Sequence, residues 1–184
     1  MKWLIASDIH GSALYCSRLL CALRQEQPDR FILLGDILYH GPRNPLPENY
    51  DPKKVAEMLN GLPAPPLCVR GNCDSEVDQM VLSFPILADY ALFCDEKLGM
   101  LATHGHIFNA DNPPKSGGWS VLLQGHTHIP KIDKRDGYVC LNPGSVSIPK
   151  EDSPHSYMIA ENGEFLWKTL EGTVFNSFSR GGDL

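Results

Sequence analysis

The first half of the chain alternates between short apolar runs and segments with helical spacing. Three apolar runs, residues 2–7 (KWLIAS), 30–35 (RFILLG) and 66–72 (PLCVRGN), are predicted to be buried strands. Apolar residues recur at helical spacing over residues 13–26, and Asp51-Pro52 is typical of the start of a helix, here one that ends near Asn60. Strands that alternate with helices in this way predict a parallel sheet of the α/β class.

In the second half, apolar runs follow one another across short turns. Residues 90–106 (YALFCDEKLGMLATHGH) are predicted to form two strands around a tight turn, and residues 120–128 (SVLLQGHTH) a buried strand that ends in a polar loop. Asp136-Gly137 and Asn162-Gly163 stand at hairpin positions. We therefore expect antiparallel hairpins to dominate after about residue 85, and a frayed tail at about residues 173–184.

Length and composition narrow the class of protein. Residues 1–184 contain no linker-like stretch and are expected to form a single domain. A net charge of −6 argues against an extended nucleic-acid-binding surface, and no apolar run approaches the ~20 residues that span a membrane. The six cysteines include no CxxC pair and mostly lie in apolar segments, which predicts a reduced, cytoplasmic protein.

Several of the predicted strands end in residues that commonly bind metal ions. In chain order these residues are Asp8, His10, Asp36, Asn72, His104, His106, His126 and His128. A single His or Asp at such a place is ordinarily solvated or a helix cap, but five of the seven histidines gather in three of these loops. The carboxyl ends of strands in an open α/β sheet converge, so we expect these side chains to meet. Imidazole and carboxylate groups suit divalent ions, and a set this large predicts two ions, the usual arrangement for hydrolysing phosphate esters.

The same loops resemble the signature of the calcineurin-like metallophosphoesterase superfamily. The matching blocks are DIHG at 8–11, GD at 35–36, GNCD at 71–74, GHIF at 105–108 directly after His104, and GHTH at 125–128, and NPGS at 142–145 extends the match. Within the superfamily the chain is most similar to the small YfcE-type phosphodiesterases. That closer likeness lies in HGPRNPLPE at 40–48, RGNCDSEVDQM at 70–80 and NPGSVSIPK at 142–150.

The resemblance implies a four-layer α/β/β/α sandwich with two mixed sheets and a dinuclear metal centre. Carried over by position, Asp8, His10 and His128 would hold the first ion. Asn72, His104 and His126 would hold the second ion, and Asp36 would bridge the two. The family commonly uses Mn²⁺, with Fe, Zn, Ni or Co as alternatives.

The activity that the resemblance implies is metal-dependent hydrolysis of a small phosphodiester. Two divalent ions and the carboxylates of Asp8 and Asp36 leave a surplus of about +2, which attracts phosphate despite the acidic chain. A metal-coordinated hydroxide would attack phosphorus, and Asp36, Asn72 and His104 would act in catalysis through the metals. Alternatives are a phosphomonoesterase or nucleotide phosphatase, and a non-catalytic protein-binding scaffold like the retromer subunit Vps29. Such scaffolds tend to lose metal ligands, whereas all seven positions are kept here.

Cys73 marks a departure from the family pattern, because many members have His directly after the metal-binding Asn. A thiol carries no positive charge and is a poorer proton donor to an alkoxide, so one interpretation is a preference for diesters or good leaving groups. The other is that Cys73 is a compact filler. We do not expect it to act as a covalent nucleophile, and we expect Asp74 to cap its loop.

Other polar residues near these motifs have two interpretations each. His106 would either position a ligand or contact phosphate, Arg43 would either clamp a phosphate oxygen or lie on the surface, and Asn142 and Ser145 would line or brace the site. Loops 38–52 and 105–119 determine the physiological substrate, which the sequence leaves open. Apolar residues outside the predicted elements are candidates for a homo-oligomer interface or for local packing, namely Phe84, Phe108 and Trp119.

Overall fold

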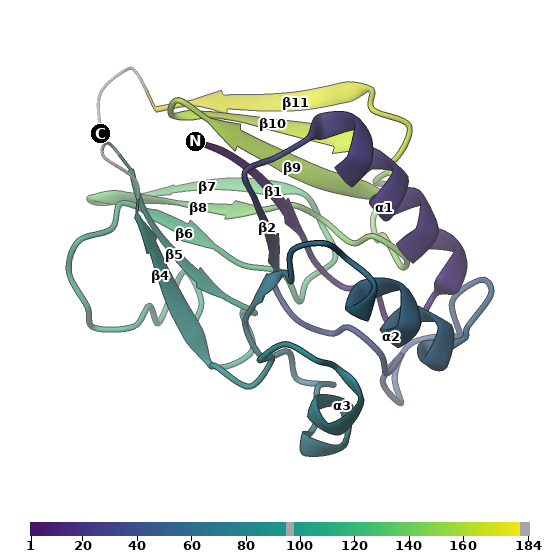
Figure 1. Cartoon of the computed structure of the whole chain (residues 1–184). Coiled ribbons are helices and arrows are strands. Elements are labelled where there is room, and N and C mark those ends of the chain that lie inside the picture. The colour runs from purple at the N-terminus through teal and green to yellow at the C-terminus, as the bar shows by residue number, and fades with distance from the viewer. Residues whose placement is uncertain (95–97, 181–184) are drawn as a thin grey trace.

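The computed structural model describes residues 1–94 and 98–180, which form two mixed β-sheets packed face to face (Figure 1). The first sheet has the order β11-β10-β9-β1-β2-β3 and comprises β1 (Lys2–Ala6), β2 (Arg30–Leu33), β3 (Leu67–Cys68), β9 (Ser156–Glu161), β10 (Glu164–Thr169) and β11 (Val174–Ser179). The second has the order β4-β5-β6-β8-β7 and comprises β4 (Tyr90–Cys94), β5 (Gly99–Thr103), β6 (Val121–Leu123), β7 (Lys131–Arg135) and β8 (Tyr138–Asn142). The predicted α/β class with two mixed sheets is confirmed.

Strand pairing agrees with the sequence in the first half and only partly in the second. Strands β1, β2 and β3 are parallel, and the hairpins β7–β8 and β9–β10 turn at the two predicted Xaa-Gly pairs. Strands β5, β6 and β8, however, run parallel to one another, so the expected dominance of antiparallel pairs is wrong for the centre of the second sheet. The long loop between β5 and β6 returns the chain to the same end of the sheet, which a tight turn cannot do. The turn predicted between β4 and β5 lies at residues 95–97, outside the described residues.

The expectation of a frayed tail is wrong for Val174–Ser179. This segment forms β11, an edge strand that pairs antiparallel with β10. Five of its six side chains are exposed, and Phe178 packs on Phe165 with 6.1 Å between ring centroids. A strand held mainly by backbone hydrogen bonds lacks the apolar alternation on which the prediction depended. Residues 181–184 lie outside the described part of the chain.

Two helices have the predicted bounds, and a third was not predicted. α1 (Ala13–Glu26) begins at Ser12, and α2 (Pro52–Asn60) begins at Asp51, whose carboxylate accepts a hydrogen bond from the Lys54 N–H. The short α3 (Glu76–Val81) follows a capping box between Ser75 and Asp78. Among residues 1–94 and 98–180, no helix has the length and apolar character needed to cross a membrane.

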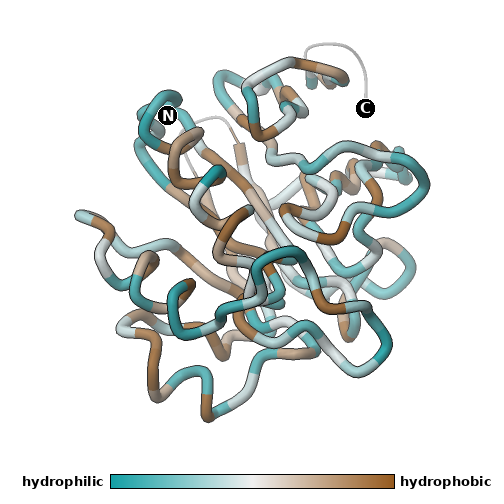
Figure 2. Tube along the Cα trace, turned by 90° about the vertical axis from the view of Figure 1, so that its right-hand side faces the viewer, coloured by the Kyte–Doolittle hydropathy of each residue, from teal (hydrophilic) through white to brown (hydrophobic). Residues whose placement is uncertain are grey.

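The first sheet separates two apolar cores. Leu4 and Ala6 of β1 face the core beneath α1 and α2, while Trp3 and Ile5 face the core between the sheets. Full burial of a Leu or Ile side chain, as at Leu4 and Ile5, stabilises the fold by about 1.5–3 kcal/mol. Figure 2 shows hydrophobic and hydrophilic segments alternating along the chain, with hydrophilic segments over much of its outline.

The outer face of the second sheet is covered by a loop where the four-layer expectation places helices. Ala110 and Trp119 of the β5–β6 connection pack over Leu122 and Cys140, and the Tyr138 hydroxyl donates to the Ala110 carbonyl at 2.7 Å. Trp119 and Phe108 therefore pack locally, against Tyr138 and Tyr90 respectively. Phe84, a candidate for an oligomer interface, is instead buried in the core beneath the helices.

Candidate metal centre

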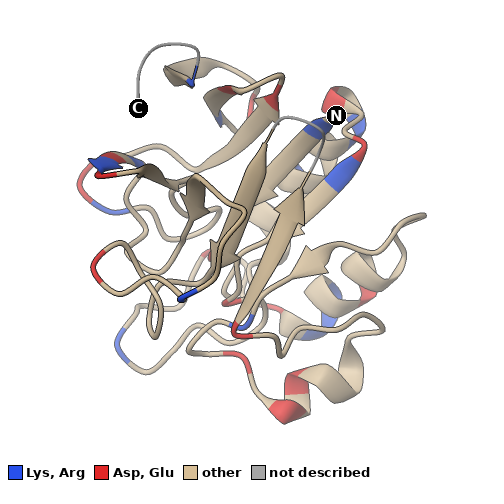
Figure 3. Ribbon diagram, turned by 90° about the vertical axis from the view of Figure 1, so that its left-hand side faces the viewer, with Lys and Arg blue, Asp and Glu red and all other residues tan. Residues whose placement is uncertain are grey.

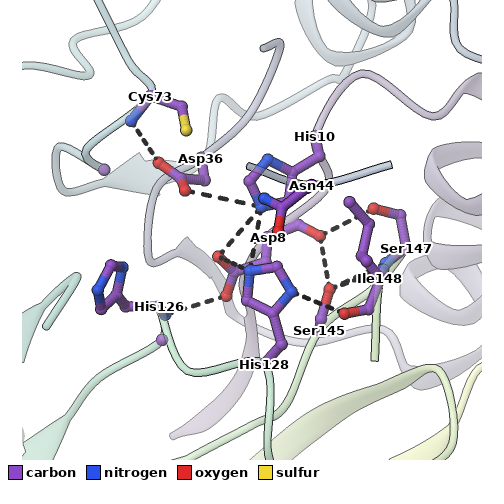
Figure 4. Close-up of polar contacts among 12 residues, drawn as sticks. Asp8, His10, Asp36, Asn44, Cys73, His126, His128, Ser145, Ser147 and Ile148 are labelled. Carbon is purple, nitrogen blue, oxygen red and sulfur yellow. Dashed lines mark hydrogen bonds and ion pairs between the residues drawn. The ribbon is translucent and has the colours of Figure 1, made fainter. Parts of the chain in front are cut away.

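The loops that follow β1, β2, β3, β5 and β6 meet at one edge of the two sheets and bring the predicted polar residues together. The first group comprises Asp8, His10 and His128, all buried (Figure 4). The Nε2 atoms of the two histidines lie 3.2 Å apart, and Asp8 Oδ1 lies 3.3 Å from His128 Nε2 and 3.6 Å from His10 Nε2. Three residues separated by up to 120 positions in the chain therefore place their ligand atoms in contact.

Backbone carbonyls determine which nitrogen of these rings carries the proton. His10 Nδ1 lies 2.8 Å from the Tyr39 carbonyl oxygen, and His128 Nδ1 lies 2.7 Å from that of Ile148. A carbonyl oxygen only accepts, so both Nδ1 atoms are N–H donors. In the neutral rings each Nε2 atom carries a lone pair. The two lone pairs face each other and the carboxylate of Asp8. Such an arrangement is stable only with a cation, either a proton or a metal ion, between them.

A second group repeats this arrangement around His104. Its Nδ1 donates to the Leu34 carbonyl at 2.6 Å, which turns the Nε2 lone pair toward Asn72 Oδ1 at 3.1 Å. The His126 ring lies beside that of His104, with 5.1 Å between ring centroids. Asn72 is exposed, whereas His104 is fully buried.

Asp36 lies between the two groups. Its Oδ2 atom is 3.6 Å from His10 Nε2 and 3.4 Å from His104 Nε2, while its Oδ1 accepts the Cys73 N–H at 2.8 Å. One carboxylate oxygen is thus held by the backbone and the other faces both sets of ligand atoms. The position suits the bridging role expected for Asp36.

The spacing of these atoms and an unpartnered oxygen both fit divalent metal ions. Atoms that bind one ion at about 2.1 Å lie about 3.0–3.4 Å from one another, close to the separations observed here. Asp8 Oδ1 is buried and has no hydrogen-bond partner among the described residues. A buried carboxylate oxygen without a donor is costly unless a cation compensates it, so the residues present fit metal binding.

Charge couples these groups strongly. Although burial opposes ionisation, the imidazoles of His10 and His128 hold the pKa of Asp8 well below its usual range. His104 likewise offsets burial at Asp36 and lowers the pKa of that carboxyl. Burial opposes the charged form of His104, but the carboxylates of Asp36 and Asp8 raise the pKa of this ring to about 9. Burial and the carboxylate of Asp36 raise the pKa of the Cys73 thiol, which keeps it protonated and disfavours a nucleophilic role.

The backbone around the centre is strained, and glycines make room for the ligands. Five candidate ligands have left-handed φ values between 48° and 67°, namely Asp8, His10, Asp36, His126 and His128. Non-glycine residues in this region cost roughly 1–2 kcal/mol each and cluster at functional sites. A Cβ atom at Gly71 would lie 2.1 Å from Asp36 Oδ1, and one at Gly125 would lie 2.9 Å from Asp8 Oδ2. These contacts explain why glycine precedes both Asn72 and His126.

Polar side chains behind the ligands brace the loops. The buried carboxylate of Asp74 accepts the N–H groups of Asp36, Ile37 and Gly71 at 2.8–2.9 Å, as expected of a loop cap. Burial, with the charge of Asp36, raises the pKa of Asp74 to about 6 against these donors. Ser145 and Ser147 both donate to the Asp8 carbonyl (Figure 4).

Asn142 braces the loop that carries His126 and His128. Its side-chain amide donates to the Gly125 carbonyl at 2.8 Å and to Thr127 Oγ1 at 3.0 Å. Together with Ser145, Asn142 therefore supports the candidate ligands from behind, which agrees with the bracing interpretation of these two residues.

An open cleft of about 1130 Å³ leads to the centre. Asp36, Asn72, His126 and His128 line it, together with three cations, Arg43, Arg70 and Lys150. Elsewhere the charged residues are mixed in sign (Figure 3). The cleft thus holds a local group of cations, although the net charge of the chain is negative. Arg43 thus lies at the site, while His106 is outside the lining and packs against His104 with 5.3 Å between ring centroids.

Comparison with known proteins identifies the family. A family model described as the calcineurin-like phosphoesterase superfamily domain matches residues 1–164. The chain is a calcineurin-like phosphoesterase. It is 49% identical to the phosphodiesterase YfcE of Escherichia coli K12 over 162 residues, or 88% of each chain. The solved structure of YfcE, a phosphoesterase from E. coli, matches with a TM-score of 0.92 and 44% identity, over 97% of this chain and 99% of that one.

A more distant structural neighbour is Vps29 of Entamoeba histolytica in complex with Zn²⁺. It matches the phosphoesterase with a TM-score of 0.62 and 18% identity, over 97% of this chain and 98% of that one. At this identity the likeness concerns the fold alone.

The sequence did not reveal several groups that build the site of the phosphoesterase. The carbonyls of Leu34, Tyr39 and Ile148 orient the imidazoles, but every residue has a carbonyl and no side-chain pattern singles these out. Lys150 in the cleft was also missed, although it lies within the NPGSVSIPK block.

Proposed function

We propose that this phosphoesterase hydrolyses phosphodiester bonds at a centre that holds two divalent metal ions. The observation that carries the proposal is the convergence of the Nε2 atoms of His10, His104 and His128 on the carboxylates of Asp8 and Asp36, where the buried Asp8 Oδ1 has no hydrogen-bond partner among the described residues. The 49% identity to the E. coli phosphodiesterase YfcE supports diesters as the substrate class.

Two sets of residues would hold the ions. Asp8, His10 and His128 would bind the first, Asn72, His104 and His126 would bind the second, and Asp36 would contact both. Mn²⁺ is the expected ion, with Fe, Zn, Ni or Co as alternatives that the same nitrogen and oxygen donors accept. Divalent ions held there would polarise the phosphoryl oxygens and acidify water to supply the hydroxide nucleophile.

Residues of the cleft would orient the substrate and favour a diester. The side chains of Arg43 and Lys150 can pair with phosphate oxygens near the centre. Cys73, whose thiol stays protonated and uncharged, offers no cation to the second negative charge of a phosphomonoester. A diester carries a single negative charge, so it suits this environment better.

The test is turnover of bis(p-nitrophenyl) phosphate and p-nitrophenyl phosphate by Mn²⁺-loaded protein. Asp36→Asn and His104→Ala should abolish turnover of the diester, and a chelator should abolish it reversibly. Asp133→Asn, an exchange in β7 away from the cleft, is the matched control and should keep the rate. A near wild-type rate in either site variant would refute the assignment of the site.

The same measurements decide between the alternatives. A higher kcat/KM for the monoester would replace the proposal with a phosphomonoesterase or nucleotide phosphatase. Purified protein that binds no metal and turns over neither ester would support a non-catalytic scaffold like Vps29.

A further inference from the structure

A second pocket opens beside the cleft of the candidate metal centre, between α2, α3 and the loop after β2. Its volume is about 460 Å³, and its apolar lining includes Leu38, Tyr39, Tyr50, Ala56, Val77 and Val81. Tyr39, Cys73 and Ser75 line both the pocket and the cleft. A ligand bound at the centre can therefore extend into the pocket.

One wall of the pocket is a preassembled aromatic cluster. The His40 ring packs edge-on against Tyr39 and Tyr50, with ring centroids 4.8 Å and 5.2 Å away. The Tyr39 carbonyl also accepts the His10 Nδ1–H, which ties this wall to the first group of candidate ligands. Aromatic side chains held in this way bind apolar groups at little entropic cost.

Another part of the lining belongs to α3, whose apolar residues do not serve the core. None of its six residues, all within the described chain, is buried. Val77 is 68% exposed and Val81 is 53% exposed, and both line the pocket. Figure 1 shows α3 as a separate short helix beside α2. Apolar side chains left open to solvent next to a cleft are typical of a ligand-binding surface.

Charge at the pocket is limited. Asp78 also lines it, but its carboxylate accepts the N–H and hydroxyl of Ser75 in the capping box that begins α3. Among the described residues that line the pocket, Lys53 is the one with a positive charge. A strongly charged group would lose hydration against these walls without gaining a set of partners, whereas an uncharged ring would bury apolar surface.

We infer that this pocket binds an aromatic ester group of the substrate while the phosphate lies at the metal centre, an inference that rests on the proposed function. The volume lies within the range of about 300–1,000 Å³ typical of small-molecule pockets. Tyr39 and Tyr50 both line the pocket, and aromatic side chains pack well against planar aromatic groups. The substrate class is thereby narrowed to phosphodiesters of aryl or nucleoside alcohols.

The test compares binding of phenylphosphonate and methylphosphonate to the Mn²⁺-loaded protein by calorimetry, which needs no turnover. Wild-type protein should bind phenylphosphonate about ten-fold more tightly, because the ring buries apolar surface in the pocket. Val77→Asn should remove most of this preference. Met80→Asn is the matched control, because Met80 lies on the same helix, is 83% exposed and is not part of the pocket lining. It should keep the preference.

Failure of the pocket is distinguishable from failure of the proposed function. Equal affinities for the two phosphonates in a protein that hydrolyses bis(p-nitrophenyl) phosphate would overturn the pocket and leave the phosphodiesterase intact. If Val77→Asn leaves the preference for phenylphosphonate unchanged, the pocket is likewise overturned and the phosphodiesterase remains intact. Absence of both hydrolysis and phosphonate binding would overturn the two together.

Discussion

Asp74 holds two loops of the candidate centre from behind, and we expect its loss to weaken metal binding. Its Oδ2 accepts the N–H groups of Asp36 and Gly71, and its Oδ1 accepts that of Ile37. These bonds join the loop that carries Asp36 to the loop that carries Asn72. Asp74 is therefore a positioning residue for Asp36 and Asn72, and Asp74→Asn is the perturbation that tests this role.

The magnitude follows from the three bonds. An amide in place of the carboxylate can keep the two bonds to Oδ2, but its NH₂ group then faces the Ile37 N–H. One lost bond and one buried donor without an acceptor cost about 1–3 kcal/mol in the free energy of unfolding. Displacement of the Asp36 backbone should also weaken metal binding about 10–100-fold, as loss of supporting partners does elsewhere.

Ser75→Ala is the matched control, because Ser75 follows Asp74 directly and is the N-cap of α3. Its loss should lower the free energy of unfolding by about 1 kcal/mol without changing the hydrogen bonds to Asp36. Urea denaturation of chelator-treated protein measures stability, and electron paramagnetic resonance of free Mn²⁺ measures affinity. Both variants should lose stability, and only Asp74→Asn should lose affinity. If the two variants bind Mn²⁺ equally well, Asp74 is a structural cap and no more.

Three further outcomes are expected. Cys73→His should raise kcat/KM for p-nitrophenyl phosphate relative to bis(p-nitrophenyl) phosphate, because an imidazole can protonate an alkoxide and carry positive charge; an unchanged ratio would contradict this account of Cys73. His128→Ala should lower the bound metal from two ions to one per chain by elemental analysis, and retention of two would show that the first group is wrongly assigned. Far from the cleft, burial opposes ionisation of Glu26, but Lys168, Lys2 and the Tyr157 hydroxyl lower its pKa from 4.5 to about 2. Because the folded-state pKa is depressed, this stabilisation is present above about pH 4.5 and is lost as the pH falls toward 2. Glu26→Gln should therefore lower the free energy of unfolding by about 1–3 kcal/mol at pH 7 and by progressively less below pH 4.5, as measured by urea titrations. If the difference in stability between wild type and variant does not change with pH, the ion pairs are not its cause.

The elements that the sequence predicted are those whose signals are local. The bounds of α1 follow from the helical spacing of its apolar residues, and those of α2 from Asp51-Pro52. The hairpin turns follow from Asp136-Gly137 and Asn162-Gly163. The strand β11 has no apolar alternation of its own and depends on pairing with β10, which a local pattern does not reveal. The helix α3 could have been found, because Ser75 and Asp78 have the spacing of a capping box.

The candidate site was predicted as a set of residue types and not as a geometry. Asp, Asn and His at strand ends indicated metal ligands because strand ends converge in an α/β sheet. The orientation of each imidazole depends on a carbonyl from a distant loop, such as Leu34 for His104 across 70 positions. The apolar pocket beside the cleft also needs tertiary structure, because α3 and the Tyr39 loop meet there only in the folded chain.

The strain of the backbone and the opposed lone pairs have a common consequence. Left-handed φ values at Asp8, His10 and Asp36, and Nε2 atoms that face each other at 3.2 Å, are each unfavourable in isolation. They persist because other parts of the fold hold the same loops, as Ser145 and Ser147 hold the Asp8 carbonyl. The fold therefore preorganises the candidate ligand atoms, at a cost in stability that a bound cation would offset. We therefore expect substitutions behind the candidate ligands, as well as at the ligands, to weaken metal binding.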